Sequence, residues 1–281
     1  MTHTAAPATR PRLPSVGALL FGQIRYQLSL LLATPNALVI GIGLPVLLMI
    51  VFHPQRGSFA PASVAGFAIF GLTVTAWNTH GIRLIQAREA GVLKRWRATP
   101  LPRWCYFLGR ILTTSLFATA AGAVTIAVGV LFYHAHLTAP AAGAMLIAMI
   151  LGSLAWSAAA TAMTGLISTA ESANPIFMIV YFPVVIISGG FGPLSVLPHW
   201  LTTLASYLPA QPMVDALTNS LRHAAGAPFL PGRDVAVLVA WAVVGIVAAV
   251  VLFRWEPHRP AAKRPPRAGA CPVDAGARAG A

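Results

Sequence analysis

Long apolar runs separated by short polar segments dominate this chain. A helix needs roughly 20 mainly apolar residues to cross the ~30 Å hydrocarbon core of a bilayer. Six runs approach this length, namely Asn36–Phe52, Ala62–His80, Phe107–Tyr133, Ala141–Ile167, Asn174–Gly190 and Val235–Arg254. Apart from Arg110 in the first turn of the third run and Arg254 at the end of the sixth, they contain no Asp, Glu, Lys or Arg, and a charge at mid-bilayer costs at least ~2.5 kcal/mol. They lack the alternation of a membrane strand, so the pattern predicts an all-α integral membrane protein with six spans.

The run before the first span has a different character. Val16–Leu32 is interrupted by Gln23, Arg25 and Gln27, and its apolar residues gather on one arc of a helical wheel. This pattern predicts an amphipathic helix over 15–34 that lies in the cytoplasmic interface; the alternative is a frayed extension of the first span. Residues 1–14, and the Pro-, Gly- and Arg-rich residues 257–281, are expected to be disordered.

The segment between the fifth and sixth predicted spans is apolar but divided by prolines. Phe191–Ala216 contains Pro193, Pro198, Pro209 and Pro212, so it cannot span twice. Short re-entrant helices near the outer face are predicted here. The charged residues that follow are interpreted as a surface ion-pair set: Asp215, Arg222, His223 and Asp234.

Composition supports a membrane protein and charge gives its orientation. Hydrophobic residues make up 57% of the 281 residues and charged residues only 9%, against roughly 25% charged in soluble domains. With both termini cytoplasmic, 16 of the 19 Lys and Arg residues lie inside, which satisfies the positive-inside rule. This placement accounts for the net charge of +13 without nucleic acid. The Ala, Arg and Pro content fits a GC-rich bacterial source, so a bacterial plasma membrane is expected.

The cytoplasmic loop between the second and third spans concentrates the charge. Its sequence predicts a short amphipathic helix, with Leu93 and Trp96 on one face and basic residues on the other, that stops at Pro100. A soluble partner that binds such a helix would move the two flanking spans. On composition alone, a solvated basic loop that only sets orientation is the alternative.

The loop also carries a recognisable pattern. It reads Glu89-x-Gly91-x-Leu93-Lys94-Arg95-x-Arg97-x-Thr99-Pro100-x-Pro102. This resembles the loop signature of ABC-2 type transport permeases, especially the daunorubicin-resistance subgroup. Val92 replaces the usual Thr, and Trp96 stands where Leu or Tyr is commoner, but both keep the amphipathic pattern. The resemblance covers roughly residues 15–256, with 35–256 as the transmembrane domain of a type V exporter-like fold.

The resemblance implies that this chain is the permease subunit of a drug exporter. Two such subunits, identical or different, would each dock a separate ATP-binding subunit that uses ATP and Mg²⁺. The residues expected to couple to that subunit are Glu89, Gly91, Leu93, Arg95, Arg97, Thr99 and Pro100. The cargo would be a hydrophobic or amphiphilic small molecule such as an antibiotic. Export of a lipid or polysaccharide is the alternative within the class, and an ATP-independent channel, a scaffold or a membrane enzyme is the alternative outside it.

The sequence gives little support for catalysis by this chain. Its two lysines, Lys94 and Lys263, do not follow a Gly-x-x-x-x-Gly pattern, so no P-loop is present and no cofactor is expected. Cys105 and Cys271 both fall on the predicted cytoplasmic side, which argues against a disulfide. His134 and His136 lack a third ligand nearby, so neither a metal site nor a catalytic group is predicted.

Polar and aromatic residues inside the second and fifth spans are candidates for the transport path. By analogy with the family, these spans of both protomers line a central path. The candidates are Thr73, Trp77, Asn78, Phe177, Met178, Tyr181 and Ser188; ordinary packing is the alternative for each. In the fourth span Ser153, Ser157, Thr161 and Thr164 share one face, which favours close helix packing. The basic tail could also contact anionic lipid.

Overall fold

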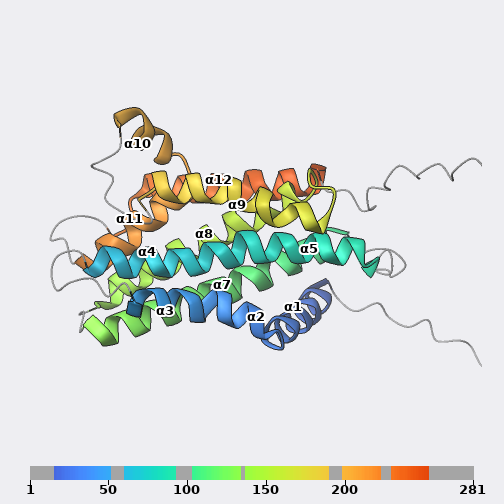
Figure 1. Cartoon of the computed structure of the whole chain (residues 1–281), viewed down its shortest axis with the longest axis horizontal. Helices are drawn as coiled ribbons and strands as arrows, with labels where there is room; N and C mark the ends of the chain where they lie inside the picture. The colour runs from blue at the N-terminus through green and yellow to red at the C-terminus, as the bar shows by residue number, and fades with distance from the viewer. Residues whose placement is uncertain are drawn as a thin grey trace, which may run out of the picture.

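The computed structural model describes residues 16–51, 60–92, 103–133, 137–189, 198–222 and 229–252. These residues form helices joined by turns and short connections, and no strand occurs among them. The longer helices run side by side in one bundle (Figure 1). The predicted all-α class is therefore confirmed for the described part of the chain. The termini predicted to be disordered lie outside it.

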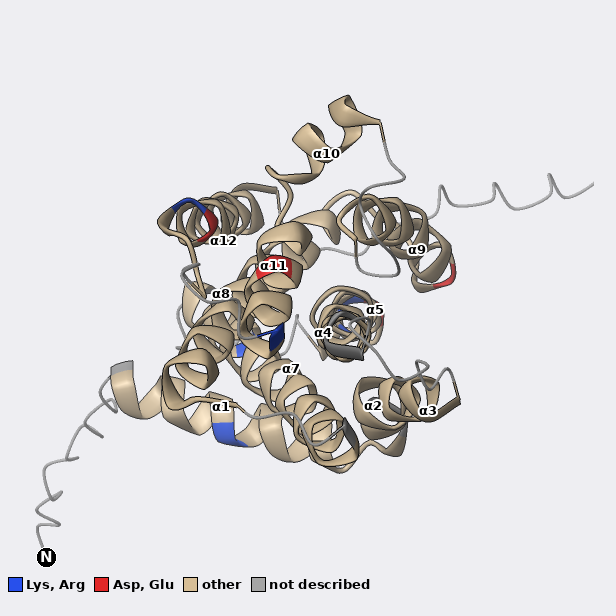
Figure 2. Cartoon of the chain, turned by 90° about the vertical axis from the view of Figure 1, so that its left-hand side faces the viewer, with Lys and Arg blue, Asp and Glu red and all other residues tan. Residues whose placement is uncertain are grey.

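Helix α1 (Val16–Leu32) occupies the stretch predicted to be interfacial. Figure 2 looks along the bundle and shows α1 from the side, whereas α9 and α12 are seen nearly end-on. The face that α1 turns towards the protein is not the predicted apolar arc, since Gln23 and Gln27 are buried and Phe21 is 69% exposed. Gly109 of the neighbouring helix α7 permits this approach, because a Cβ there would lie 2.8 Å from Cγ of Gln23. That α1 lies in a membrane interface stays a prediction.

The first predicted span consists of three consecutive elements. They are α2 (Pro35–Leu38), the π-helical segment η1 (Val39–Gly43) and α3 (Leu44–Val51). The second predicted span is continuous from α4 (Ala60–Thr73) through the π-helical η2 (Val74–Thr79) to α5 (His80–Glu89). The two π-helical segments contact each other. They meet where Gly41 leaves room for Thr75, whose Oγ1 would lie 2.8 Å from a Cβ at position 41.

The second stretch continues beyond its predicted end at His80 because the polar residues there find partners within the protein. Nδ1 of His80 lies 2.8 Å from Oγ1 of Thr114, and Nε2 lies 2.9 Å from Oγ1 of Thr161. The ring is only 2% exposed. A buried polar side chain is tolerated when its hydrogen bonds are made, so the helix extends past His80 without a break.

Four described helices are long and apolar enough to cross a membrane. They correspond to the third to sixth predicted spans and are α7 (Arg103–Tyr133), α8 (Ala139–Met163), α9 (Ala170–Ile187) and α12 (Gly232–Leu252). Helix α9 starts before the predicted Asn174 because Thr169 caps it: Oγ1 of Thr169 accepts a hydrogen bond from the Ser172 amide. The chain is therefore a multi-pass membrane protein.

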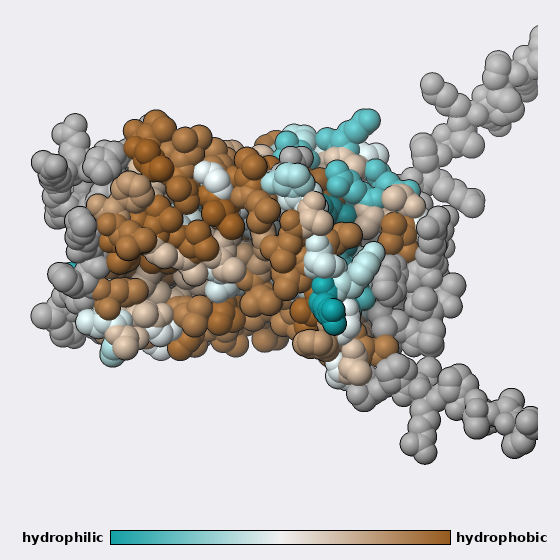
Figure 3. Space-filling view, turned by 90° about the horizontal axis from the view of Figure 1, so that it is seen from below, coloured by the Kyte–Doolittle hydropathy of each residue, from teal (hydrophilic) through white to brown (hydrophobic). Residues whose placement is uncertain are grey.

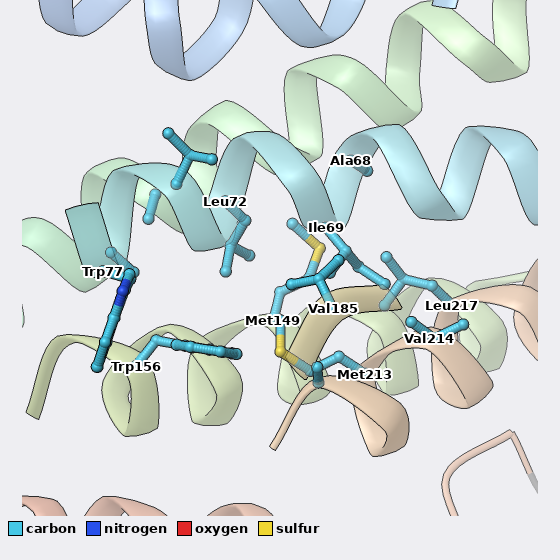
Figure 4. Close-up of a cluster of buried hydrophobic side chains, with 14 of the residues drawn as sticks. Ala68, Ile69, Leu72, Trp77, Met149, Trp156, Val185, Met213, Val214 and Leu217 are labelled. Carbon is cyan, nitrogen blue, oxygen red and sulfur yellow. The ribbon is translucent and has the colours of Figure 1, made fainter. Parts of the chain in front are cut away.

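The core lies where α4 and η2 meet α8, α9 and α11 (Ala210–Arg222). Figure 4 shows Trp77 and Trp156 side by side, and Met149 and Met213 filling the space beneath Ile69. The two indole rings are 5.4 Å apart in an edge-to-face arrangement, a geometry that aromatic pairs prefer. Because lipid tails are as apolar as these side chains, close packing rather than exclusion of water holds such a core together.

Small residues let α8 contact its neighbours at short range. A Cβ on Gly245 of α12 would lie 2.9 Å from both Cβ of Ala158 and the Ala159 amide nitrogen. On its other side, the hydroxyl of Ser153 lies 3.1 Å from that of Thr119 in α7. The small polar stripe of α8 thus packs inside the chain, as the sequence favoured.

The segment predicted to be re-entrant contains two short helices in its described part. Helix α10 (His199–Ala205) projects from the bundle, whereas α11 packs against α4 and α8 (Figure 1). Close contact with α8 is possible because Gly152 lies directly beneath Met213. Entry of these helices into the membrane stays a prediction.

Figure 3 shows a broad apolar surface over most of the bundle, with polar residues gathered towards the end that carries α1 and the end of α5. We call this the α1 end. Such a band of exposed apolar side chains is the surface that a helical bundle presents to lipid.

Candidate functional site

The last turn of α5 is attached to the segment between α8 and α9, which we call the α8–α9 connector (residues 164–169). Arg88 makes this attachment and is 1% exposed. Its Nη1 donates to the carbonyl of Thr164 at 2.9 Å, and its Nη2 donates to those of Ile167 and Ser168 at 2.5 and 3.2 Å. The Thr164 carbonyl lies at the C-terminal end of α8, where carbonyls lack partners within the helix and carry partial negative charge. The guanidinium satisfies it together with two carbonyls of the connector that follows.

An arginine side chain stays protonated in proteins, so the connector is held by a permanent positive charge. In the sequence, Arg88 is simply one of the basic residues on the expected cytoplasmic side. No signal in the local sequence distinguishes it from its neighbours, because its partners lie more than seventy residues away.

Glu89 extends the same attachment to the start of α9. One of its carboxylate oxygens, Oε1, accepts a hydrogen bond of 2.7 Å from the amide of Ala170. A negative charge at a helix N-terminus is favourable because of the unpaired amides and the helix dipole. Glu89 was predicted to contact a partner ATPase. In this structure its side chain is exposed at the surface and also caps α9.

Gly91 ends α5 in the left-handed region, with φ of +70°. Its amide donates to the carbonyl of Arg88 at 3.2 Å, and the Ala90 amide donates to that of Gln86. Glycine commonly closes a helix in this way. The structure therefore places Glu89 and Gly91 of the predicted coupling set in one turn; the remaining members, Leu93, Arg95, Arg97, Thr99 and Pro100, lie outside the described residues.

Replacing Gly91 with alanine is expected to destabilise this turn by about 1–2 kcal/mol, the cost of placing a Cβ in the left-handed region. No atom lies within 4 Å of a Cβ at this position, so backbone strain is the whole of the expected effect. Thermal unfolding in detergent and hydrogen exchange of the α5 amides would measure it. Gly91→Asn is the matched control, since asparagine tolerates this conformation better. Equal effects of the two variants would contradict the explanation.

The predicted path residues pack against one another inside the single chain. The hydroxyls of Thr73 and Tyr181 are 2.9 Å apart. Thr73 also donates to the carbonyl of Ile69 at 2.7 Å, so its one hydroxyl proton is used and Tyr181 is the donor to Thr73. Nε1 of Trp77 donates to the carbonyl of Phe177 at 2.9 Å, and the two rings meet edge to face at 5.1 Å. The structure thus brings residues of the second and fifth predicted spans together within one chain.

The other three candidates differ in exposure. Nδ2 of Asn78 donates to Oδ1 of Asn174 at 3.3 Å, but Oδ1 of Asn78 has no partner among the described residues. The hydroxyl of Ser188 is likewise buried without a described partner, and Met178 is half-buried. Contact with cargo stays a prediction for all seven residues. The structure adds that Trp77 and Asn78 lie on the π-helical η2, a type of segment often found at functional sites.

At the opposite end of the bundle, Asp215 of α11 lies close to Asp234 of α12 rather than in an ion pair with a described residue. Its pKa is raised to about 6, chiefly because burial disfavours the carboxylate and also because Asp234 is negatively charged; a hydrogen bond with Gln211 opposes the shift. The interpretation as a surface ion-pair set is therefore not supported for Asp215. His223 lies outside the described residues.

Asp215→Asn is expected to stabilise the protein at neutral pH. Because the pKa of Asp215 is raised in the folded state, its carboxyl group contributes fully to the free energy of unfolding below its ordinary pKa of about 4. That contribution is lost as the pH rises through about 6. The variant should gain about 2 kcal/mol above pH 7 and almost nothing at pH 4. Unfolding temperatures in detergent at both pH values would test this. A gain of equal size at pH 4 would contradict the role of ionisation.

Among the described residues, no three His, Cys, Asp or Glu side chains lie close enough to hold a metal ion. His134 and His136 fall outside the described ranges.

Comparison with known proteins decides the class. The model of a family described as "ABC-2 family transporter protein" matches residues 31–251. This chain belongs to the ABC-2 transporter family. The match includes the α5 turn and every helix from α2 to α11, together with nearly all of α12. The predicted family resemblance is confirmed.

Two curated relatives have the same name. A protein named "Probable multidrug ABC transporter permease YbhR" in Escherichia coli K12 is 23% identical over 158 residues, covering 55% of this chain and 41% of the relative. The protein of that name in Escherichia coli O157:H7 matches equally. This ABC-2 chain thus spans less than half the length of the curated relatives it matches.

Proposed function

We propose that this ABC-2 protein is the permease subunit of an ABC exporter in a bacterial plasma membrane, with both termini in the cytoplasm. A separate ATP-binding subunit supplies the energy, and a second permease subunit, identical or different, completes the pathway. The cargo is a hydrophobic or amphiphilic small molecule such as an antibiotic; export of a lipid or polysaccharide is the alternative. The family match and the name of the YbhR relatives support this class of cargo.

Six spans follow if α2–η1–α3 and α4–η2–α5 cross the membrane beside the four long helices. The second of these stretches is unbroken from Ala60 to Glu89. The first includes an apolar helical segment, Val39–Val51. It crosses if its ends extend towards the polar regions or the bilayer thins locally. With six spans and both termini inside, the α1 end is cytoplasmic, which is where positive charge accumulates in membrane proteins.

The observation that carries the proposal is the attachment of the α5 turn to the α8–α9 connector. Arg88 binds three carbonyls of the connector, and Glu89 binds the first amide of α9. Through this turn, the loop that follows Gly91 is connected to the α8–α9 connector and to α9 as well as to α5. A force applied to that loop by a partner reaches α5, α8 and α9 together. This gives the ATP-binding subunit a rigid connection to three membrane helices, as an energy-coupling segment requires.

Movement of cargo requires the contact of α4 and η2 with α9 to change. In the present conformation Thr73 of α4 and Trp77 of η2 pack against Phe177 and Tyr181 of α9. On its other face α9 exposes Ile179 and Ile186 at 72% and 52%. We infer that rotation of α9 by the connector, together with a second permease subunit on this exposed face, creates the path.

The proposal is tested by co-expressing the chain with candidate ATP-binding subunits and measuring complex formation and transport-coupled ATP hydrolysis in vesicles. Glu89→Gln and Glu89→Ala separate the two roles of this residue. Gln keeps an oxygen that can accept from the Ala170 amide but removes the charge, whereas Ala removes both. We expect Gln to reduce coupling with only a small fall in unfolding temperature, because the dipole interaction of an exposed charge is weak, and Ala to reduce both more strongly.

Glu171 provides a charge control, because it is exposed in the first turn of α9 and has no described hydrogen-bond partner. Glu171→Gln removes the same charge at the same end of the bundle. Coupling that survives in Glu89→Gln and Glu89→Ala alike would overturn the proposed role of the turn. Transport by the purified chain without any nucleotide-hydrolysing companion would overturn the function.

A further inference from the structure

A cavity of about 400 Å³ lies at the α1 end, between α1, η2, α5 and α7. Its size is within the range of small-molecule sites. None of the predicted path residues is among those that line it. Neither the coupling turn nor the proposed path uses this cavity.

The cavity contains two positive charges and no negative charge among its lining residues. Arg83 of α5 and Arg110 of α7 both line it, and the charge of Arg110 acts unfavourably on Arg83. Arg110 donates to the hydroxyl of Tyr106 at 3.1 Å, which leaves its charge uncompensated. Within the described ranges neither guanidinium is paired with a carboxylate. Two like charges in a partly enclosed site are costly unless an anion joins them.

Neutral hydrogen-bond donors complete the cavity. Thr75 lines the cavity and is 1% exposed, and its buried hydroxyl has no hydrogen-bond partner among the described residues. Thr79, Gln27 and Gln86 line the same space. His80 is not available as a donor, because both of its ring nitrogens are already within hydrogen-bond distance of threonine hydroxyls. Two arginines with adjacent hydroxyl and amide donors form the kind of site that binds phosphate oxygens.

The surroundings favour a phosphate carried by a lipid. Leu30 and Leu31 of α1 line the cavity, and Leu30 is 50% exposed at its edge. Beyond it α1 exposes Leu32 at 52%. In Figure 3 the polar residues of the α1 end adjoin the broad apolar surface. A molecule with its phosphate in the cavity can therefore lay its acyl chains along apolar side chains.

We propose that this cavity binds the phosphate group of an anionic membrane phospholipid between Arg83 and Arg110, with the acyl chains leaving past Leu30 along α1. The bound lipid fixes α1 against α5 and α7. This inference goes beyond the proposed transport function and does not depend on it, because no cargo, nucleotide or partner subunit is involved.

The test uses the purified full chain in lipid nanodiscs or detergent, with native mass spectrometry and thermal unfolding as readouts. Phosphatidylglycerol, phosphatidylcholine, glycerol 3-phosphate and inorganic phosphate are titrated separately. We expect phosphatidylglycerol alone to be retained and to raise the unfolding temperature. Arg83→Gln and Arg110→Gln should each weaken its binding by about tenfold or more, since each removes a charge-assisted hydrogen-bond donor.

Arg25→Gln is the matched control, because Arg25 is exposed on α1 and does not line the cavity. Should a glutamine variant fail to fold, Leu30→Trp narrows the mouth without changing any charge and should also weaken binding. Equal loss of binding in Arg25→Gln and Arg83→Gln would overturn the site in favour of general surface attraction. Inorganic phosphate binding as tightly as phosphatidylglycerol would overturn the lipid as its occupant, and undiminished binding in all the cavity variants would overturn the proposal.

Discussion

Arg88→Met is expected to destabilise the protein by about 3 kcal/mol or more, the largest effect of any single substitution discussed. The variant keeps an apolar stem of similar length but removes the hydrogen bonds to the carbonyls of Thr164, Ile167 and Ser168. Each buried carbonyl left without a partner costs about 1–3 kcal/mol. Thermal unfolding in detergent would measure the loss, and hydrogen exchange should rise first in the α8–α9 connector.

Two variants separate the causes of this loss. Arg88→Lys keeps the positive charge but presents a single ammonium, which cannot match the planar fork of the guanidinium; an intermediate loss is expected. Arg25→Met removes an exposed arginine of α1 and should leave the unfolding temperature nearly unchanged. An unfolding temperature for Arg88→Met equal to that of the parent would show that the connector does not depend on this side chain.

Gly81→Ala is expected to destabilise the protein by about 1–3 kcal/mol through overpacking. A Cβ at this position would lie 2.1 Å from Cζ of Phe177. The ring has no room to move, because Phe177 is completely buried and Trp77 packs against it edge to face. Adding one methyl group must therefore push α5 and α9 apart. The unfolding temperature and the yield of folded protein would report the effect.

The cause is tested by a double-mutant cycle with Phe177→Leu, which shortens the side chain that the new methyl group meets. The double variant should be more stable than the sum of the single effects by about 1 kcal/mol or more. Gly143→Ala in α8 is the control, since nothing lies within 4 Å of a Cβ there and alanine favours an exposed helix. Strict additivity of Gly81→Ala and Phe177→Leu would contradict the proposed clash.

The two predictions together describe how the α5 turn and the α5–α9 contact cooperate. Arg88 and Glu89 determine where the connector and the start of α9 lie, and Gly81 determines how closely the two helices approach. If transport needs α9 to move, variants that loosen either contact should change coupled ATP hydrolysis as well as stability. A variant that loses stability while keeping its coupling ratio would place that contact outside the transport cycle.

Much of the fold could be predicted from the sequence because the bilayer imposes a simple requirement on it. A run of apolar residues long enough to span must be helical, since no other local structure pairs all its backbone groups in lipid. The helices α7, α8, α9 and α12 were therefore predicted with nearly correct bounds. The Glu89 and Gly91 pattern also indicated the family, which the match over residues 31–251 confirmed.

The partners of the polar residues could not be predicted in this way. Glu89 was expected to face another protein, yet it also caps α9 through Ala170, 81 residues further along the chain. Arg88 was counted as a loop charge and is instead buried. Helix α1 was expected to lie in the membrane interface, but its sequence did not show that it buries Gln23 and Gln27, or that Gly109 of α7 leaves space for Gln23.

The sequence by itself determined that this chain forms membrane helices, which end of them carries the positive charge, and to which family it belongs. Hydrophobic length and charge are local properties that the surrounding lipid and water act on directly. The tertiary structure alone decided that Arg88 binds the connector, that two π-helical segments meet at Gly41 and Thr75, and that Arg83 and Arg110 share a cavity. These features depend on distances between helices that are remote in the chain, and those distances are set by the packing of small and large side chains together.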